Sequence, residues 1–234
     1  MNYTFQFGVL AQYQTELLAG LWLTIQLSVV SILLGAAAGT VLATLRSASG
    51  RVVRALVDGY VELIRNTPFL IQLFLIYFGL PGIGLRVGAV AAALIGMTIN
   101  LAAYSTEIIR AGIEAIHPSQ IEAGEALGFT RFQIYRYIII LPAIQKVYPA
   151  LCSQFVLMML ASSICSAISA TELTAAASYV QSQSYRSFEV YLAITGIYLA
   201  LALVLRGILA LIGLWLFGRR TTRRVLRSVA TAAA

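Results

Sequence analysis

The sequence predicts an all-α membrane protein with five transmembrane helices, and its composition is the main reason. Of the 234 residues, 60% are hydrophobic and only 11% are charged, whereas soluble domains carry about 25% charged residues. The apolar residues form continuous runs, as in membrane helices, instead of the alternating pattern of barrel strands. Because the chain does not open with the basic segment and cleavage site of a secretory signal, we expect the first span to remain in the mature protein.

Five apolar runs are long enough to cross a bilayer, alone or with tilt. Residues 1–19 are expected to form an interfacial segment, 20–217 the transmembrane domain and 218–234 a basic tail. A polar loop rich in Ser, Tyr and Gln is expected at 172–189. The predicted spans are 20–45, 61–80, 87–113, 147–171 and 190–217.

The basic residues predict the orientation of these spans. Clusters of Arg and Lys follow spans one, three and five, whereas the loops after spans two and four hold only Arg86 and Arg186. Basic loops stay in the cytoplasm. We therefore expect a periplasmic amino terminus and a cytoplasmic carboxyl terminus, with the segment after span three also in the cytoplasm.

That cytoplasmic segment, residues 115–142, is the longest polar-rich interruption of the chain. Ser119 and Glu122 match a capping box, which predicts the start of a helix. Gly128 can end that helix in a left-handed conformation.

A second short helix is expected directly after this turn. Thr130 and Gln133 can cap its start, and Pro142 is expected to end it. The caps alone are equally compatible with a plain linker, since any two membrane helices need one.

The same segment resembles the "EAA…G…I-x-LP" loop of ABC-importer permeases. The resemblance implies that the loop is cytoplasmic and docks into a groove of a separate ATP-hydrolysing subunit. The residues at the positions of this motif are Glu122, Ala123, Gly124, Gly128, Ile138, Leu141 and Pro142.

Two positions of the loop depart from the family pattern. Gly124 stands where Ala is usual, and the segment between Gly128 and Pro142 is one residue longer than in the family pattern. We expect the second departure to affect the packing of the second short helix more than the docking itself.

A second resemblance covers residues 60–81, which are similar to the second span of polar amino-acid ABC permeases of the histidine, arginine and glutamine type. With the loop and span three it extends over most of residues 60–173. It implies a type I ABC-importer permease fold in the bacterial inner membrane. The implied partners are a dimer of ATP-binding subunits, a second identical or different permease, a periplasmic solute-binding protein, the amino acid and membrane lipid.

The chain itself lacks the residues of a nucleotide motor or of an enzyme. Its single lysine is Lys146, so it contains no GxxxxGK[ST] phosphate loop. His117 is the only histidine, and no cluster of His, Cys and carboxylates has metal-ligand spacing. We therefore expect no catalytic residue, metal or cofactor in this chain, with ATP and Mg²⁺ bound by a partner subunit. No soluble basic domain is available to bind nucleic acid.

Ionisable residues inside spans are candidates for function. Glu62 and Arg65 are three apart and can pair on one helix face, as a gate or only as a brace. Glu107 is a candidate gate or a partner of Arg110.

Several polar side chains are candidates for the substrate path. Asn100, Tyr104 and Glu107 share one helical stripe, which either lines a wet cavity or clamps neighbouring helices. Ser162 and Ser166 form another stripe, for which close helix packing is the alternative. The amino-acid permeases often carry a lysine just before this stripe, and residues 160–164 lack it. Either the substrate differs, or a partner permease supplies the cation.

Three further residues complete the candidate set. Gln72 is expected on the substrate path. Glu172 is expected at the outer mouth, where it could attract an amino group or contact a docking protein. Arg206 either snorkels along its helix or pairs with a carboxylate.

Together these features predict the transmembrane subunit of an ATP-driven importer for a polar, and by preference basic, amino acid. The alternatives are an ion-coupled carrier or channel for small polar solutes and a structural membrane scaffold. A carrier needs a midplane carboxylate or inverted repeats, neither of which is clear in the sequence.

Overall fold

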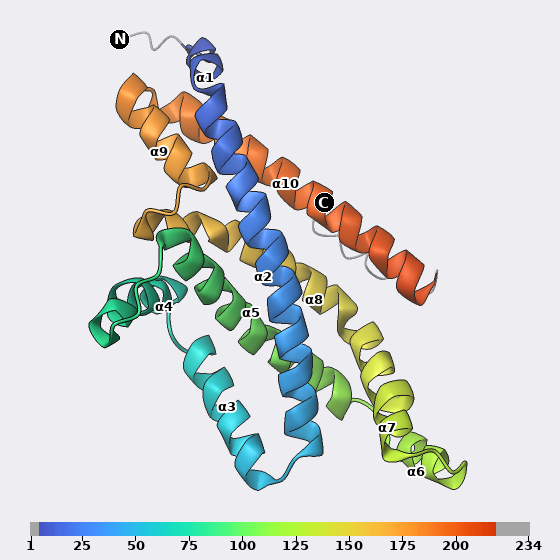
Figure 1. Ribbon diagram of the computed structural model, residues 1–234. Coiled ribbons are helices and arrows are strands. Elements are labelled where there is room, and N and C mark those ends of the chain that lie inside the picture. The colour runs from blue at the N-terminus through green and yellow to red at the C-terminus, as the bar shows by residue number, and fades with distance from the viewer. Residues whose placement is uncertain (1–4, 219–234) are drawn as a thin grey trace. The chain divides into compact units, whose positions relative to one another are not determined.

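The computed structural model describes residues 5–218, and all regular secondary structure in that range is helical (Figure 1). Apart from Gly218, the predicted basic tail lies outside the described residues. The described chain divides into two compact units. Most of the long helices contribute residues to both units. Unit 1 comprises the chain up to Leu33, Thr67–Ile99 and Val156–Leu205, and unit 2 comprises Leu34–Asn66, Asn100–Phe155 and the chain from Arg206 onwards.

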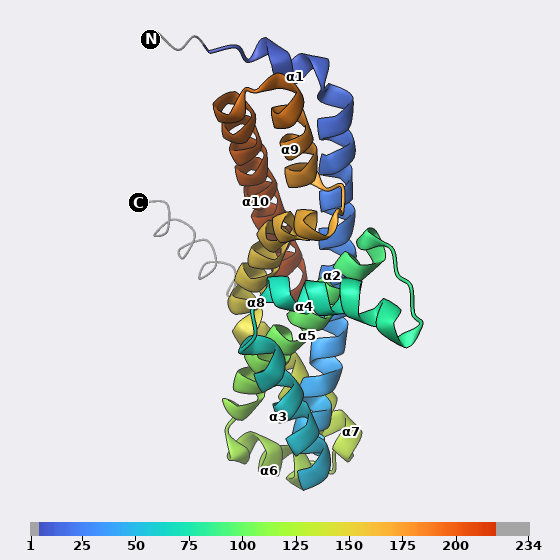
Figure 2. The ribbon, with the colours of Figure 1, turned by 90° about the vertical axis from the view of Figure 1, so that its left-hand side faces the viewer.

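Unit 1 contains a small apolar core between three helices. These are the first half of α2 (Gln14–Ala48), α9 (Leu173–Ser184) and the first part of α10 (Ser187–Phe217) (Figure 2). The core side chains are Leu17, Leu173, Ala176, Ala177, Val180, Val190 and Ile194. The other elements that lie wholly in this unit are α1 (Gly8–Gln12), α4 (Phe69–Phe74), the π-helix η1 (Leu75–Gly79), and the 3₁₀-helices η2 (Leu80–Ile83) and η4 (Ser162–Ile168).

Unit 2 is built around a close contact of α2 with α5 (Ala89–Glu114). Gly39 on α2 leaves no room for a side chain, because an added Cβ would lie 2.5 Å from Ser105 Cβ and 2.9 Å from the Ala102 carbonyl oxygen. Gly35, one turn earlier, is in similar contact with Leu101. Small residues four apart allow membrane helices to approach closely. The other elements are α3 (Arg51–Arg65), α6 (Pro118–Ala126), α7 (Arg131–Gln133), the π-helix η3 (Ile134–Ile140) and most of α8 (Leu141–Ala161).

The structure confirms an all-α membrane fold. Four helices are long and apolar enough to cross a membrane, and a fifth span exists if the broken pair Arg51–Arg65 and Phe69–Ile83 counts as one. The first span begins at Gln14, within the segment predicted to be interfacial.

The prediction of one continuous helix at 61–80 is wrong. α3 ends at Arg65 and α4 starts at Phe69. Pro68 precedes α4 in an extended conformation. Proline removes a backbone donor and disfavours helical geometry in the residue before it, so the helix breaks here.

The prediction that Pro142 ends a short helix is also wrong, because one helical segment runs from Arg131 to Ile168. Pro142 follows η3, in which the N–H of Leu141 bonds the carbonyl of Arg136, five residues back. This wider turn accommodates a proline that would otherwise clash with the preceding turn.

The predicted polar loop at 172–189 contains a helix, α9. The Glu172 carboxylate caps its start by accepting hydrogen bonds from the N–H groups of Thr174 (2.9 Å) and Ala175 (3.0 Å). A polar composition concealed this helix, because it buries only one face.

Candidate functional site

The first half of the predicted docking loop is the helix α6. It starts at Pro118, and His117 is its cap: Nδ1 accepts a hydrogen bond from the N–H of Ser119 at 3.3 Å. The predicted capping box of Ser119 and Glu122 is therefore wrong, because proline favours the first helical position and the N-cap is His117, two residues before Ser119.

The end of α6 is a Schellman motif. Gly128 is left-handed, with φ of 77°, as predicted. Its N–H bonds the Glu125 carbonyl at 2.9 Å, and the N–H of Phe129 bonds the Gly124 carbonyl at 3.1 Å. The motif satisfies two carbonyl groups that the helix end would otherwise leave without partners.

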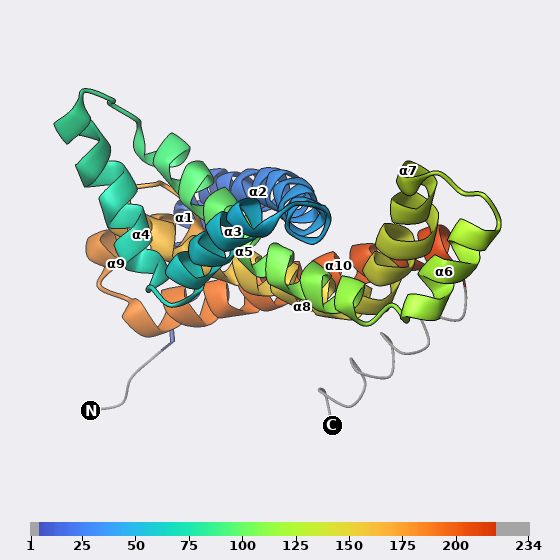
Figure 3. The same ribbon diagram turned by 90° about the horizontal axis from the view of Figure 1, so that it is seen from below.

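The second half of the loop begins with a complete capping box, as predicted. Thr130 Oγ1 accepts a hydrogen bond from the N–H of Gln133 at 3.3 Å, and Gln133 Oε1 accepts one from the N–H of Thr130 at 2.8 Å. We call residues 118–140, which comprise α6, the turn, α7 and η3, the docking hairpin; Figure 3 shows its two arms joined by the turn.

The hairpin exposes matched residues and apolar side chains together. Glu122 and Ala123 are exposed, and Leu127 and Phe132 are 74% and 71% exposed. Exposed apolar side chains that cluster on a short hairpin are typical of a protein contact.

The two positions that depart from the family pattern are in contact in the structure: Gly124 packs against the π-helix η3. A Cβ on Gly124 would collide with Cδ1 of Ile138, which lies in η3. A π-helical turn contains one residue more than an α-turn, which fits the extra residue between Gly128 and Pro142. The wider turn and the glycine thus form one packing arrangement.

A second feature of unit 2 is a polar cavity of about 460 Å³. Three arginines and three carboxylates line it, together with Tyr104, Asn66 and Val61. The charged residues are Arg46, Asp58, Glu62, Arg65, Glu107 and Arg110.

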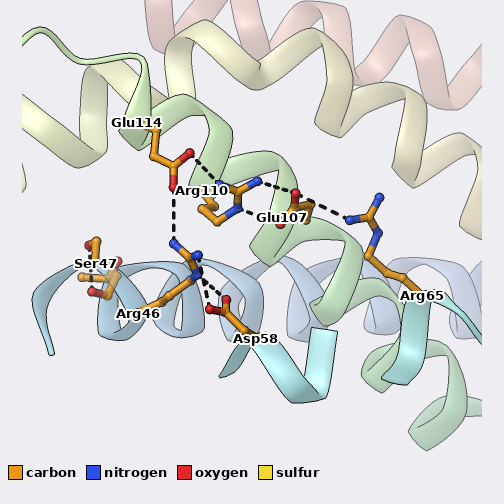
Figure 4. A network of polar contacts seen from close by, with 8 residues as sticks. Arg46, Ser47, Asp58, Arg65, Glu107, Arg110 and Glu114 are labelled. Atoms are coloured by element: carbon orange, nitrogen blue, oxygen red, sulfur yellow. Dashed lines mark hydrogen bonds and ion pairs between the residues drawn. The ribbon is translucent and has the colours of Figure 1, made fainter. Parts of the chain in front are cut away.

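Ion pairs connect α2, α3 and α5 around this cavity (Figure 4). Arg110 pairs with Glu107 and with Glu114, and the predicted pair Glu107–Arg110 is thereby confirmed. Arg46 pairs with Asp58 and, at 3.4 Å, with Glu114.

The pair predicted between Glu62 and Arg65 is not formed. Arg65 is the last residue of α3, and its partners lie on α5 instead of on α3. It lies over the ring of Tyr104, 5.4 Å from the centroid, and pairs with Glu107 at 3.6 Å.

The three residues Asn100, Tyr104 and Glu107, predicted to form one stripe on α5, do not all line the cavity. Tyr104 and Glu107 line the cavity, whereas Asn100 is buried and does not. Contact of Asn100 with a solute stays a prediction.

The other path candidates have local partners. Gln72 Nε2 donates to the Thr67 carbonyl (3.1 Å) and hydroxyl (2.9 Å). Ser162 donates to the Met159 carbonyl, and Ser166 to the Ser163 carbonyl, both at 2.7 Å. These serine bonds return to the preceding turn, as helix-packing serines do.

Glu172 is completely buried. Besides the two α9 amides, Tyr198 donates to its carboxylate at 2.7 Å. The prediction that Glu172 is accessible at an outer mouth is therefore wrong for this structure. Burial is the main cause that raises the pKa of the Glu172 carboxyl, against the opposing effect of these hydrogen bonds.

The sequence did not single out Arg46, Asp58 or Glu114 as site residues. In the sequence, Arg46 stands out only as part of the basic cluster after span one, and residues 51–60 lie outside the predicted spans. The amphipathic pattern of residues 51–65 was the available signal. Within residues 5–218, no group of three or more His, Cys, Asp or Glu side chains is placed to hold a metal ion.

An all-helical membrane fold in which two short helices form a hairpin between two membrane helices is what the permease class of importers was expected to show. Residues 18–218 match the family model described as "Binding-protein-dependent transport system inner membrane component", and the chain belongs to this family.

Named relatives agree with this assignment. The nopaline transport system permease protein NocM of Agrobacterium fabrum is 34% identical over 86% of this chain and 88% of its own length. The probable glutamine ABC transporter permease protein GlnM of Bacillus subtilis is 34% identical over 88% of this chain and 93% of its own length.

Solved structures agree as well. A chain described as "Crystal structure of an amino acid ABC transporter with histidines" superposes with a TM-score of 0.81 at 37% identity, covering 90% of this chain and 99% of that chain. The MetNI methionine transporter shares the fold, with a TM-score of 0.69 at 22% identity. The permease fold predicted from the sequence is confirmed.

Proposed function

We propose that this chain is the transmembrane subunit of an ATP-driven importer for a polar amino acid. The supporting observation is the match of residues 18–218 to the importer family, together with the close structural likeness to an amino acid ABC transporter. The permeases named above are described as transporting nopaline and glutamine, which supports an amino acid or amino-acid derivative as solute.

In this proposal the docking hairpin contacts a separate ATPase. The chain assembles with two ATP-binding subunits, a second permease and a periplasmic solute-binding protein. ATP and Mg²⁺ belong to the ATPase. ATP-driven closure of the ATPase pair displaces α6, and the Schellman turn at Gly128 passes this displacement to α7.

The distribution of charge supports a cytoplasmic hairpin in the bacterial inner membrane. Of the sixteen Lys and Arg residues, Arg86 and Arg186 lie in the segments of unit 1. The other fourteen lie between Leu34 and Asn66, between Asn100 and Phe155, or after Leu205. By the positive-inside rule, the hairpin and the carboxyl terminus face the cytoplasm.

The polar cavity is proposed to line the inner part of the solute path. Tyr104 and Glu62 offer hydrogen bonds and negative charge to a solute amino group. Arg65 supplies a cation in a chain that lacks the lysine before Ser162. Asn100, Gln72, Ser162 and Ser166 remain proposed contacts.

Co-expression with the cognate ATPase tests the coupling. Glu122→Ala and Gly128→Val should abolish uptake and binding-protein-stimulated ATP hydrolysis, or release the ATPase during purification, while the chain still inserts into the membrane. Arg86→Gln, outside the hairpin, is the matched control. Uptake and hydrolysis at the control's level in both hairpin variants would contradict the proposal.

A further inference from the structure

A second cavity of unit 2, of about 960 Å³, lies between the end of α2 and the docking hairpin. Most of its wall is apolar, from side chains such as Ile134, Ile139, Ile140 and Ile144. Arg131 and Arg136 also line it, and Glu125 is its one carboxylate. The cavity therefore combines a large apolar surface with a net positive charge.

The position of this wall in the chain indicates what surrounds it. Thr44 and Ala48 end the candidate span Gln14–Ala48, and Ile140 and Ile144 lie in the candidate span that starts at Arg131. The wall thus combines the end of one candidate membrane helix with the first part of another, and we infer that it lies where acyl chains meet headgroups. Arginines at helix ends extend toward that boundary.

We propose that this cavity binds one phospholipid with an anionic headgroup, its acyl chains on the isoleucines and its phosphate beside Arg131 and Arg136. Basic pockets at the ends of membrane helices select anionic lipids in this way. The inference goes beyond the proposed function and does not depend on which solute is carried.

Charge distinguishes this lipid from other occupants. A zwitterionic lipid gains nothing from the net positive lining. The carboxyl-terminal residues 219–227 contain five arginines, which Arg131 and Arg136 repel.

The lipid would act on the contact between the hairpin and α2. One direct link here is the hydrogen bond from Tyr135 Oη to the Ser47 carbonyl, at 3.3 Å. A lipid in the cavity adds apolar contacts to both sides of this single bond. It therefore braces the docking hairpin against the first span.

The test is lipid binding to the purified full-length chain in detergent, measured by native mass spectrometry. The probes are phosphatidylglycerol and phosphatidylcholine with identical acyl chains. The double variant Arg131→Gln/Arg136→Gln should weaken phosphatidylglycerol binding by roughly 30-fold, about fivefold for each cation, with little effect on phosphatidylcholine. Arg86→Gln, which removes an arginine outside this cavity, should change neither.

A second variant tests the apolar wall. Ala48 is exposed and lines the cavity, so Ala48→Trp should fill it without disturbing the core and should weaken the binding of both lipids. Equal binding of the two lipids to the wild type would overturn the proposal, as would an Ala48→Trp variant that binds both normally.

Two further outcomes identify a protein occupant instead. If the partner ATPase displaces phosphatidylglycerol and the double arginine variant releases that ATPase, the cavity is a protein-docking surface. If the double variant changes the oligomeric state, it is an interface between copies. Either result overturns lipid binding but leaves the proposed importer function intact.

Discussion

Arg110 holds the carboxylate of Glu107 with two hydrogen bonds, from Nε at 2.8 Å and from Nη2 at 2.6 Å. The same guanidinium also binds Glu114 one turn later. Arg110 is therefore the residue through which the ion pairs of α5 are connected. Because the pair is only partly exposed, its charge-assisted bonds contribute more than those of an open surface pair.

Replacement of Arg110 tests this connection. Arg110→Ala leaves two carboxylates without their main cation and should lower the free energy of unfolding by about 1.5–3 kcal/mol, which corresponds to a fall in Tm of several degrees. Arg110→Lys should recover part of the loss. Thermal unfolding in detergent measures both, with Glu62→Gln as a control, since Glu62 shares the cavity but not this pair. A Tm of Arg110→Ala equal to that of the control would refute the assignment.

Close packing of α2 on α5 gives the second prediction. Gly39→Ala places a methyl group against the backbone of Ala102 and Thr106, which cannot move aside without separating the helices. The expected loss of stability is about 1–3 kcal/mol. Gly59→Ala in α3 is the control, because nothing lies within 4 Å of its added Cβ, and it should be neutral or slightly stabilising. Equal melting temperatures of the two variants would show that the helices are not in close contact.

The contact of Gly124 with Ile138 gives the third prediction. Gly124→Ala alone should destabilise the hairpin by about 1 kcal/mol, because the new methyl group needs the space of Ile138 Cδ1. Ile138→Val removes that atom at a cost of about 0.5–1.5 kcal/mol.

The double variant decides whether these positions are coupled. Gly124→Ala/Ile138→Val should be clearly more stable than the sum of the single effects, since the valine vacates the space that the alanine fills. A double-mutant cycle from thermal or chemical unfolding measures this coupling. Strict additivity would contradict the proposed link between the two departures from the family pattern.

The pH dependence of stability tests the burial of Glu172. Its pKa is raised in the folded chain, chiefly by burial, so the native state binds the proton more tightly than the unfolded state does. The stabilisation from protonation is complete below the unfolded pKa, about 4.3, and is lost as the pH rises through the folded pKa. Glu172→Gln should therefore flatten the fall of Tm with rising pH. Glu16→Gln, at an exposed position, should leave it unchanged; parallel curves for both variants would contradict the assignment.

Local signals in the sequence were reliable where a single turn decides the structure. Gly128 and the Thr130–Gln133 capping box were predictable because each needs only neighbouring residues. Glu107 and Arg110 were predictable for the same reason, since three residues place side chains on one helix face.

Features that depend on tertiary contacts were not predictable. The pairs of Arg46 with Asp58 and Glu114 require α2, α3 and α5 to lie together, which no spacing in the sequence reveals. Pro142 was misinterpreted because a proline normally ends a helix, and only the π-helical turn before it removes the conflict. The burial of Glu172 was not predictable either, because Glu172 follows the end of the fourth predicted span and the helix α9 that it caps was not expected.

The packing of Ile138 against Gly124 limits how the two arms of the docking hairpin can move relative to each other. Ile138 in the second arm packs against Gly124 in the first, at a position where the family usually has alanine, and the second arm continues into α8 as one helical segment. In the proposed importer, a displacement of α6 would be passed through Ile138 to η3 and to the start of α8.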